Sequence, residues 1–204
     1  MRSIAVMGFG LSVCIFLVSC SPQEQQSQKL SQLMDRLEGD QLTIEEKTDL
    51  LFLQFTEAEN HNWVVSFYEK HRADFSRRLK PSLYYAAALS SLAGAAEEIN
   101  DQLTWVRKGI AEFDRLSMEY PDDPQLLLWR SITYSNFPQM LGMNYAVEDD
   151  LTLLTLLLRE GMELTPGEYR IVYEAWRNLA SEYSEDAYLA RARSFAEEFN
   201  VSSN

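Results

Sequence analysis

The chain has 204 residues with 31 acidic and 18 basic side chains, so its formal net charge at pH 7 is −13. A nucleic-acid partner is not expected, because a phosphate backbone requires a basic face, and broad docking on anionic lipid is disfavoured for the same reason. Solubility explains the acidity, and attraction of cationic partners is the alternative explanation.

Residues 1–19 have the organisation of a secretory signal peptide. They begin with one cation, Arg2, continue through an apolar segment from Ile4 to Leu17, and end with the small residue Ser19. The apolar segment is shorter than the about 20 residues that a stable membrane-spanning helix needs. We expect residues 1–19 to be cleaved off, which removes one cation and leaves the mature chain with a charge of −14.

The quartet Leu17, Val18, Ser19 and Cys20 resembles the lipobox of bacterial lipoproteins. The resemblance implies that the chain is cut after Ser19 and that Cys20 carries a covalent lipid with acyl chains such as palmitate. One acyl chain holds a protein only marginally, whereas several hold it firmly. Ser21 rather than Asp follows the cysteine, and this implies the outer membrane, with the protein facing the periplasm. An ordinary cleaved signal with an incidental Cys20 is the alternative.

After the lipobox the sequence turns abruptly polar. Residues 20–28, CSPQEQQSQ, are expected to form the lipidated cysteine and a polar tether, and residues 29–204 a single all-α domain. Cys14 is lost with the signal peptide and Cys20 is committed to lipid, so no disulfide is expected in the mature chain. The fold must therefore depend on its core.

Helical signals begin directly after the tether. Residues 29–37 are polar and amphipathic, and Gly39 ends them. Thr43 with Glu46 three residues later is a capping-box pattern, which predicts a helix from residue 44 to about residue 58. The next expected helix carries one apolar stripe at helical spacing: Val64, Phe67, Tyr68, His71 and Phe75. We interpret His71 as a histidine of the core.

Longer helical stripes follow. Residues 103–120 and 169–183 each sustain an apolar stripe over several turns, and the last helix covers residues 188–199. Between them residues 151–158, LTLLTLLL, are apolar on nearly every side, as expected for a helix packed on both flanks. The alternation typical of strands is not found, so the predicted fold class is all-α.

Three prolines indicate an internal repeat. Pro81, Pro124 and Pro166 each stand where a helix is expected to begin, a position that suits a residue without an N–H. Their separations are 43 and 42 residues. Further helix starts are expected near Asn100, Asn144 and Ser184. The pattern predicts a two-helix repeat of about 42 residues.

Residues 109–136, GIAEFDRLSMEYPDDPQLLLWRSITYSN, resemble a junction in tetratricopeptide-repeat proteins: a helix that ends in an aromatic residue, an acidic turn with proline, and a second helix. The resemblance implies antiparallel helical hairpins stacked as a short solenoid or compact bundle. The usual period of that family is about 34 residues, so its peptide-binding positions are not transferred. Together with the lipobox, the chain is also similar to helical-repeat lipoproteins such as the T component of tripartite substrate-binding transporters.

Catalytic signatures are missing from the sequence. The only histidines, His61 and His71, are ten residues apart and lack the spacing that places two metal ligands on one helical face. Paired acidic residues stand mostly near expected helix starts, where they favour the helix dipole. We expect no enzyme, no metal and no cofactor beyond the lipid on Cys20.

Candidate binding residues lie in three segments, each with core packing as the alternative explanation. Residues 82–96 combine two tyrosines with small side chains that let a neighbouring backbone approach. A second group is aromatic and cationic, and the connection 137–145, FPQMLGMNY, is apolar for a loop. The candidates are Tyr84, Tyr85, Trp105, Trp129, Arg130, Tyr134, Phe137, Met140, Met143 and Tyr145.

The sequence thus favours a lipid-anchored, non-enzymatic scaffold that binds or assembles proteins through a helical-repeat surface. The alternative is an accessory subunit of a transport system that binds a small molecule or peptide.

Overall fold

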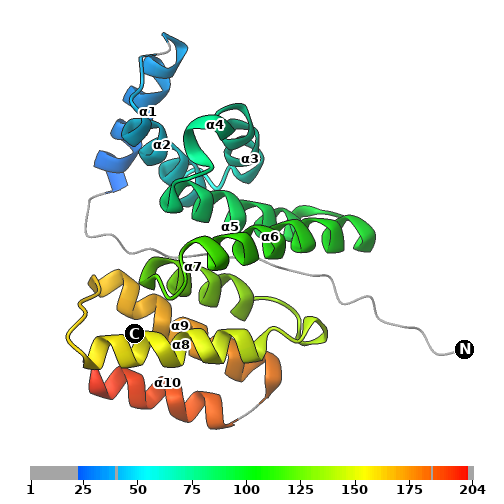
Figure 1. Cartoon of the computed structure of the whole chain (residues 1–204), viewed down its shortest axis with the longest axis vertical. Coiled ribbons are helices and arrows are strands. Elements are labelled where there is room, and N and C mark those ends of the chain that lie inside the picture. Colours follow the sequence, from blue (N-terminus) through cyan, green and yellow to red (C-terminus); the bar gives the residue numbers. More distant parts are fainter. Residues whose placement is uncertain (1–22, 40, 185, 202–204) are drawn as a thin grey trace, which may run out of the picture.

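Residues 23–39, 41–184 and 186–201 are described by a computed structural model (Figure 1), and helices make up most of them. These residues contain no strand, which confirms the predicted all-α class. The elements are α1 (Gln23–Glu38), α2 (Ile44–Thr56), α3 (His61–Lys70), α4 (Arg72–Phe75), α5 (Leu79–Ala95), α6 (Ile99–Glu119), α7 (Pro124–Ser135), the 3₁₀ turn η1 (Gln139–Leu141), α8 (Asn144–Arg159), α9 (Pro166–Tyr183) and α10 (Asp186–Glu198).

The helices form antiparallel pairs that are stacked in chain order. α5 packs on α6, α7 on α8, and α9 on α10, while α1, α2 and α3 cover the N-terminal end (Figure 1). The first helices of the pairs, α5, α7 and α9, also pack on one another and form the centre of the stack. This is the stacked-hairpin arrangement that the sequence predicts.

The proline punctuation marks the beginnings of the central helices. Pro124 and Pro166 are the first residues of α7 and α9, whereas Pro81 is the third residue of α5. In the first helical turn the missing N–H of proline has no intrahelical partner to lose. The second helices of the pairs begin at Ile99, Asn144 and Asp186, within two residues of their predicted starts.

Hydrogen bonds join equivalent positions of successive pairs. The Gln125 side-chain amide donates to the Glu168 carboxylate at 2.6 Å, 43 residues further along the chain. The Asn178 amide likewise donates to the Asn136 amide oxygen at 3.2 Å, 42 residues back. These separations equal those of the three prolines, 43 and 42 residues.

Differences from the predicted boundaries occur near the N-terminus. α1 begins at Gln23, inside the residues expected to be a tether; Gln and Glu are good helix formers even without apolar neighbours. The stripe from Val64 to Phe75 is divided between two helices, because the backbone of His71 leaves the α-helical region and ends α3. The predicted capping box of Thr43 and Glu46 is confirmed by reciprocal bonds of 3.2 and 2.9 Å.

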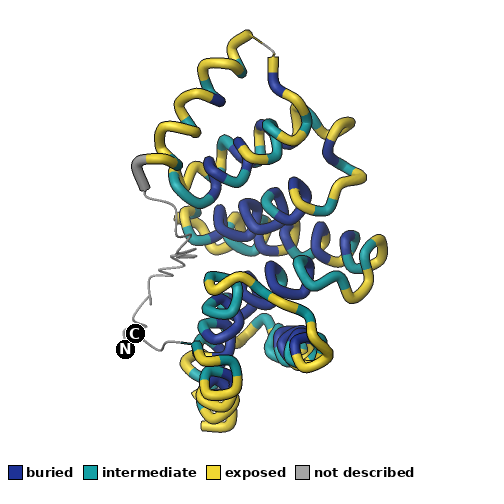
Figure 2. The backbone as a smooth tube through the Cα atoms, turned by 90° about the vertical axis from the view of Figure 1, so that its left-hand side faces the viewer, coloured by how far each residue is buried: buried dark blue, intermediate teal, exposed yellow. Residues whose placement is uncertain are grey.

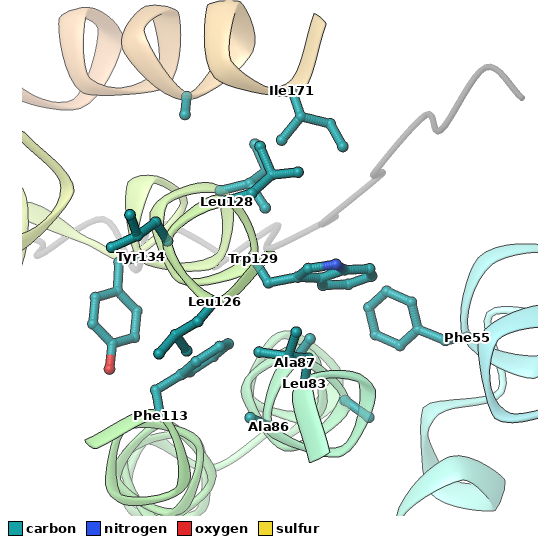
Figure 3. Close-up of a cluster of buried hydrophobic side chains, with 14 of the residues drawn as sticks. Phe55, Leu83, Ala86, Ala87, Phe113, Leu126, Leu128, Trp129, Tyr134 and Ile171 are labelled. Atoms are coloured by element: carbon teal, nitrogen blue, oxygen red, sulfur yellow. The ribbon is translucent and has the colours of Figure 1, made fainter. Parts of the chain in front are cut away.

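The core runs along the whole stack, and the buried sides of the helices face one another (Figure 2). In Figure 3 Phe113 of α6, Leu126 of α7 and Ala86 of α5 meet on one side of α7, while Leu128 points to Ile171 of α9 on the other. α8 is less enclosed than expected. Leu151, Leu154 and Leu158 are buried but Leu156 is 49% exposed, so α8 has an open flank.

Small side chains bring α5 and α6 close together. A methyl group in place of the Gly109 hydrogen would lie 2.1 Å from the Ser90 hydroxyl oxygen and 3.1 Å from the Ala86 carbonyl oxygen. A side chain at position 109 therefore fits only if neighbouring atoms move. The small residues of the 82–96 segment therefore serve close helix packing.

Candidate functional site

The ten residues singled out by the sequence do not form one surface. Tyr84 and Trp129 lie inside the stack, with ring centroids 5.3 Å apart, and each ring also meets a phenylalanine of α2. Figure 3 shows the Trp129 ring pointing toward Phe55, whereas Tyr134 leaves α7 on another side. The aromatic residues of these stripes thus form contacts between neighbouring helices.

Tyr85 belongs to a second aromatic group. Its ring stacks on Tyr68 with centroids 4.1 Å apart, and its hydroxyl donates a hydrogen bond to the Glu69 carboxylate. Arg72 closes the group with 2.7 and 3.0 Å bonds to the same carboxylate. Burial, followed by the neighbouring carboxylate, raises the pKa of Tyr85. This group fixes α3 and α4 on α5.

Arg130 is engaged in a buried ion pair. Its guanidinium donates to both oxygens of Asp150, at 2.5 and 2.8 Å, and to the Ser117 hydroxyl. Asp150 is only 2% exposed. Burial raises the pKa of this carboxyl, and Arg130 opposes the rise. The pair ties α7 to α8 and leaves Arg130 little capacity for a partner.

Tyr134 and Phe137 are also buried, and Trp105 stands apart from the other candidates. The Tyr134 ring meets Phe113 and Phe137 at 5.5 and 5.3 Å, and burial raises the pKa of its hydroxyl. Trp105 is half-buried on α6, where the Lys108 ammonium lies 4.2 Å from the centre of its ring.

The connection 137–145 combines both behaviours considered for it. Phe137 is buried, and Met143 packs against the core. Gly142 follows η1 with φ at 64°, a conformation that lets the chain turn back toward α8. Met140 and Tyr145 point outward, 76% and 73% exposed. Buried and exposed side chains therefore occur at different residues of this segment, whose last two residues, Asn144 and Tyr145, belong to α8 and not to the loop.

Beside the exposed methionine is an apolar groove, which we call the η1 groove. η1 and the end of α5 with the start of α6 form its walls, and both lie on the same side of the stack in Figure 1. Its lining is Ala93, Ile99, Gln102, Leu103, Val106, Pro138, Met140 and Leu141. Gln102 is the single polar residue of this lining, and Ile99 is 48% exposed.

Acidic residues neighbour Ile99, a lining residue of the η1 groove, along the chain. Glu97, Glu98 and Asp101 are exposed and flank Ile99 along the chain. Residues 137–145 carry no charged side chain, so no cation of that loop neutralises them. The site is therefore an apolar strip with acidic residues next to Ile99 in the chain, a combination suited to apolar groups that carry cations beside them.

Sequence reasoning missed Ile99 and Leu103 as surface residues. Leu103 was assigned to the core stripe of residues 103–120, and Ile99 belonged to no predicted site. A local signal for the exposure of Ile99 was available in the sequence. Ile99 directly follows two glutamates at the start of a helix, and at a helix start few residues of the same helix can shield an apolar side chain from solvent.

Other predicted features lie outside the described residues. The signal peptide, the lipidated Cys20 and the cleavage flank of Leu17 and Ser19 precede residue 23. From residue 23 onward, among the residues that the structure describes, no helix is both long and apolar enough to cross a membrane. The same residues bring together no three His, Cys, Asp or Glu side chains that are placed to hold a metal ion.

Comparison with known proteins gives no relative: no family model matches the chain, and neither a curated protein nor a solved structure is significantly similar to it.

Proposed function

We propose that this protein is a lipid-anchored scaffold of the bacterial cell envelope that binds a protein partner in the η1 groove. The observation that carries the proposal is the exposure of Met140 and Ile99 on an apolar groove. Exposed apolar surface costs free energy in water, roughly 25 cal/mol per Å², and contiguous patches of it on soluble domains mark interaction sites.

The partner that fits is a protein segment with apolar anchors and lysine or arginine beside them. Apolar side chains of the partner would contact Met140, whose unbranched side chain adapts to different shapes. Its cations would face Glu97, Glu98 and Asp101. The net charge of −14 of the mature chain also speeds the encounter with a basic segment at low ionic strength.

Cys20 is the proposed anchor, on the resemblance of residues 17–20 to a lipobox. A lipid there holds the stack near the membrane by a short segment, and the binding surface stays in the aqueous phase. Replacing Cys20 with alanine should release the protein from membranes into the soluble fraction. Sedimentation of Cys20→Ala with membranes would contradict the lipid anchor but not the groove.

Site-specific photo-crosslinking in producing cells tests the groove. A photoreactive residue at position 140 should give a discrete protein adduct, and the crosslinked peptide should contain apolar residues next to lysine or arginine. Met118 is the matched control, because it is also a methionine, 78% exposed, and is not part of the groove lining. Identical adducts from positions 140 and 118, or none from 140, would overturn the docking proposal.

The double replacement of Met140 and Met143 by serine separates docking from folding. Met140 is exposed and Met143 packs against the core. With the photoreactive residue at position 102, another lining position of the groove, Met140→Ser alone should remove the adduct and leave the thermal midpoint unchanged. Adding Met143→Ser should lower the midpoint.

The second candidate function is a small-molecule or peptide binding accessory of a transport system. One observation favours it, namely a cleft between α8 and α10 with mostly polar lining residues, on other helices than the η1 groove.

A further inference from the structure

A cleft of about 200 Å³ lies between the second helices of the last two pairs, α8 and α10. Both helices run side by side at the end of the stack (Figure 1). α8 packs mainly on α7, and α10 packs mainly on α9. Because α8 and α10 make few contacts with each other, a space remains between them. Trp176 of α9 and Phe195 of α10 are buried at its inner side.

Ion pairs bridge the two helices at both ends of this cleft. Glu148, in the second turn of α8, pairs with Arg191 in the middle of α10 at 2.7 Å. Near the ends of the two helices Arg159 forms two bonds with Glu198, at 2.7 and 2.8 Å. The bridges set the distance between α8 and α10, and the segment between them stays open to solvent.

The lining offers more hydrogen-bond donors than acceptors. Arg159 uses Nε and Nη2 for Glu198 and keeps Nη1 for a further partner. Arg191 uses Nη2 for Glu148, and its guanidinium lies over the Trp176 ring, 5.2 Å from the centre. Stacking on a large ring holds a guanidinium in one orientation and so prepares it for a planar or tetrahedral anion.

Hydroxyl groups complete the donor set. Thr152 and Ser194 belong to opposite walls of the cleft, and neither side chain makes a hydrogen bond within the described residues. The two cations of the lining are each paired with a carboxylate, Arg159 with Glu198 and Arg191 with Glu148. The cleft therefore offers an excess of hydrogen-bond donors rather than an excess of positive charge.

We propose that this cleft binds a small ligand through an oxyanion, either a phosphate or a carboxylate group, held by Arg159, Arg191 and the hydroxyl of Ser194. Guanidinium groups recognise both oxyanions by paired N–H bonds, which are about twice as strong as neutral ones. The existing ion pairs do not prevent this, because exposed pairs contribute only about 0–1 kcal/mol and the free N–H groups remain. The proposal does not depend on the η1 groove, which other helices form.

Titration of the full chain with inorganic phosphate and with acetate, followed by NMR at constant ionic strength with chloride as reference, tests the site. The expected result is a saturable shift of the Trp176 indole N–H and of the backbone amides around Ser194. A stronger effect of phosphate identifies a phosphate ligand class, and a stronger effect of acetate a carboxylate class. Shifts that only follow total salt, without saturation, would overturn the proposal.

Two pairs of variants locate the binding. Arg191→Gln should weaken the binding about tenfold, the expected loss for one charge-assisted bond, whereas Arg193→Gln, on the same helix and outside the lining, should not change it. Arg191→Gln also breaks a bridge between helices, so Ser194→Asp provides a second test that replaces no member of the two ion pairs. It should abolish binding, and Ser181→Asp on the exposed side of α9 should not. Equal affinities in Ser194→Asp and Ser181→Asp would refute the site.

Discussion

Replacing Gly109 with alanine should destabilise the protein, although the same change stabilises an ordinary helix. Alanine is about 1 kcal/mol more favourable than glycine in a helix interior. At position 109, however, the new methyl group would lie 2.1 Å from the Ser90 hydroxyl oxygen and 3.1 Å from the Ala86 carbonyl oxygen. The first contact is relieved by rotation of Ser90, but the second is with backbone and requires α5 to move away from α6.

The magnitude follows from these two effects. Overpacking of a close-packed interior costs typically about 1–3 kcal/mol, which exceeds the propensity gain, so we expect a net loss of up to about 2 kcal/mol. Gly109→Val adds two further methyl groups against the same backbone and should lose more. The double variant Ser90→Ala with Gly109→Ala removes the hydroxyl oxygen and should recover part of the loss. The two changes should therefore be non-additive.

Urea unfolding followed by far-ultraviolet circular dichroism measures these differences. Ala111→Gly is the matched control, because Ala111 is exposed on the same helix, and it should cost only the propensity difference of about 1 kcal/mol. A rise in stability of Gly109→Ala by that same amount would show that α5 and α6 are not in contact at Gly109, and it would refute the packing argument.

Other predictions concern the buried ion pair, the capping box and the open flank of α8. Arg130→Met should cost about 3–5 kcal/mol in urea unfolding, because it leaves the buried Asp150 carboxylate unpaired, whereas adding Asp150→Leu should restore most of the loss; equal costs of the single and the double change would contradict a paired charge. Hydrogen bonds from the Arg36 guanidinium and from the Thr43 backbone lower the pKa of Glu46 from its usual 4.5 to about 2. Because the pKa of Glu46 is lowered in the folded chain, the stabilisation by the ionised Glu46 carboxylate is complete above pH 4.5 and is lost as the pH falls from 4.5 to about 2. In Glu46→Gln the urea midpoint should therefore fall less over that pH range than in the unchanged protein. An equal fall in both would contradict the lowered pKa. Leu154→Ala should cost about 2–5 kcal/mol, while Leu156→Ala, on the exposed flank, should stay within about 0.5 kcal/mol; similar losses in thermal unfolding would show that the flank is covered.

Local signals of the sequence predicted the helices well because they depend on neighbours in the chain. A proline at the first helical position, as in Pro124 and Pro166, and a capping box such as Thr43 with Glu46 act within one turn. The predicted repeat of about 42 residues uses the same kind of local signal, a proline near the start of the first helix of each pair. Where such a signal was missing, at Gln23 and at His71, the predicted boundary differed from the observed one.

The candidate site was less predictable, because exposure depends on which helix covers a given face. Trp129 and Met140 are both large apolar residues near the same junction, yet the first is enclosed by α2 and α5 and the second is in solvent. A stripe at helical spacing identifies which side of a helix is apolar, but it does not identify the helix that packs against that side. Only the stacking order of the pairs decides this, and stacking joins residues about 40 positions apart.

The bonds between equivalent positions of successive pairs also determine how the molecule opens. Gln125 and Asn178 bind residues one repeat away, so each pair is held chiefly by its neighbours, as in a one-dimensional array. The pair of α9 and α10 has a neighbouring pair on one side only within the described residues. Its amide protons should exchange with solvent faster than those of α5 and α7, and protection should rise from the C-terminal end toward the centre. The α8–α10 cleft lies in this last part of the array, where opening requires the fewest contacts to break.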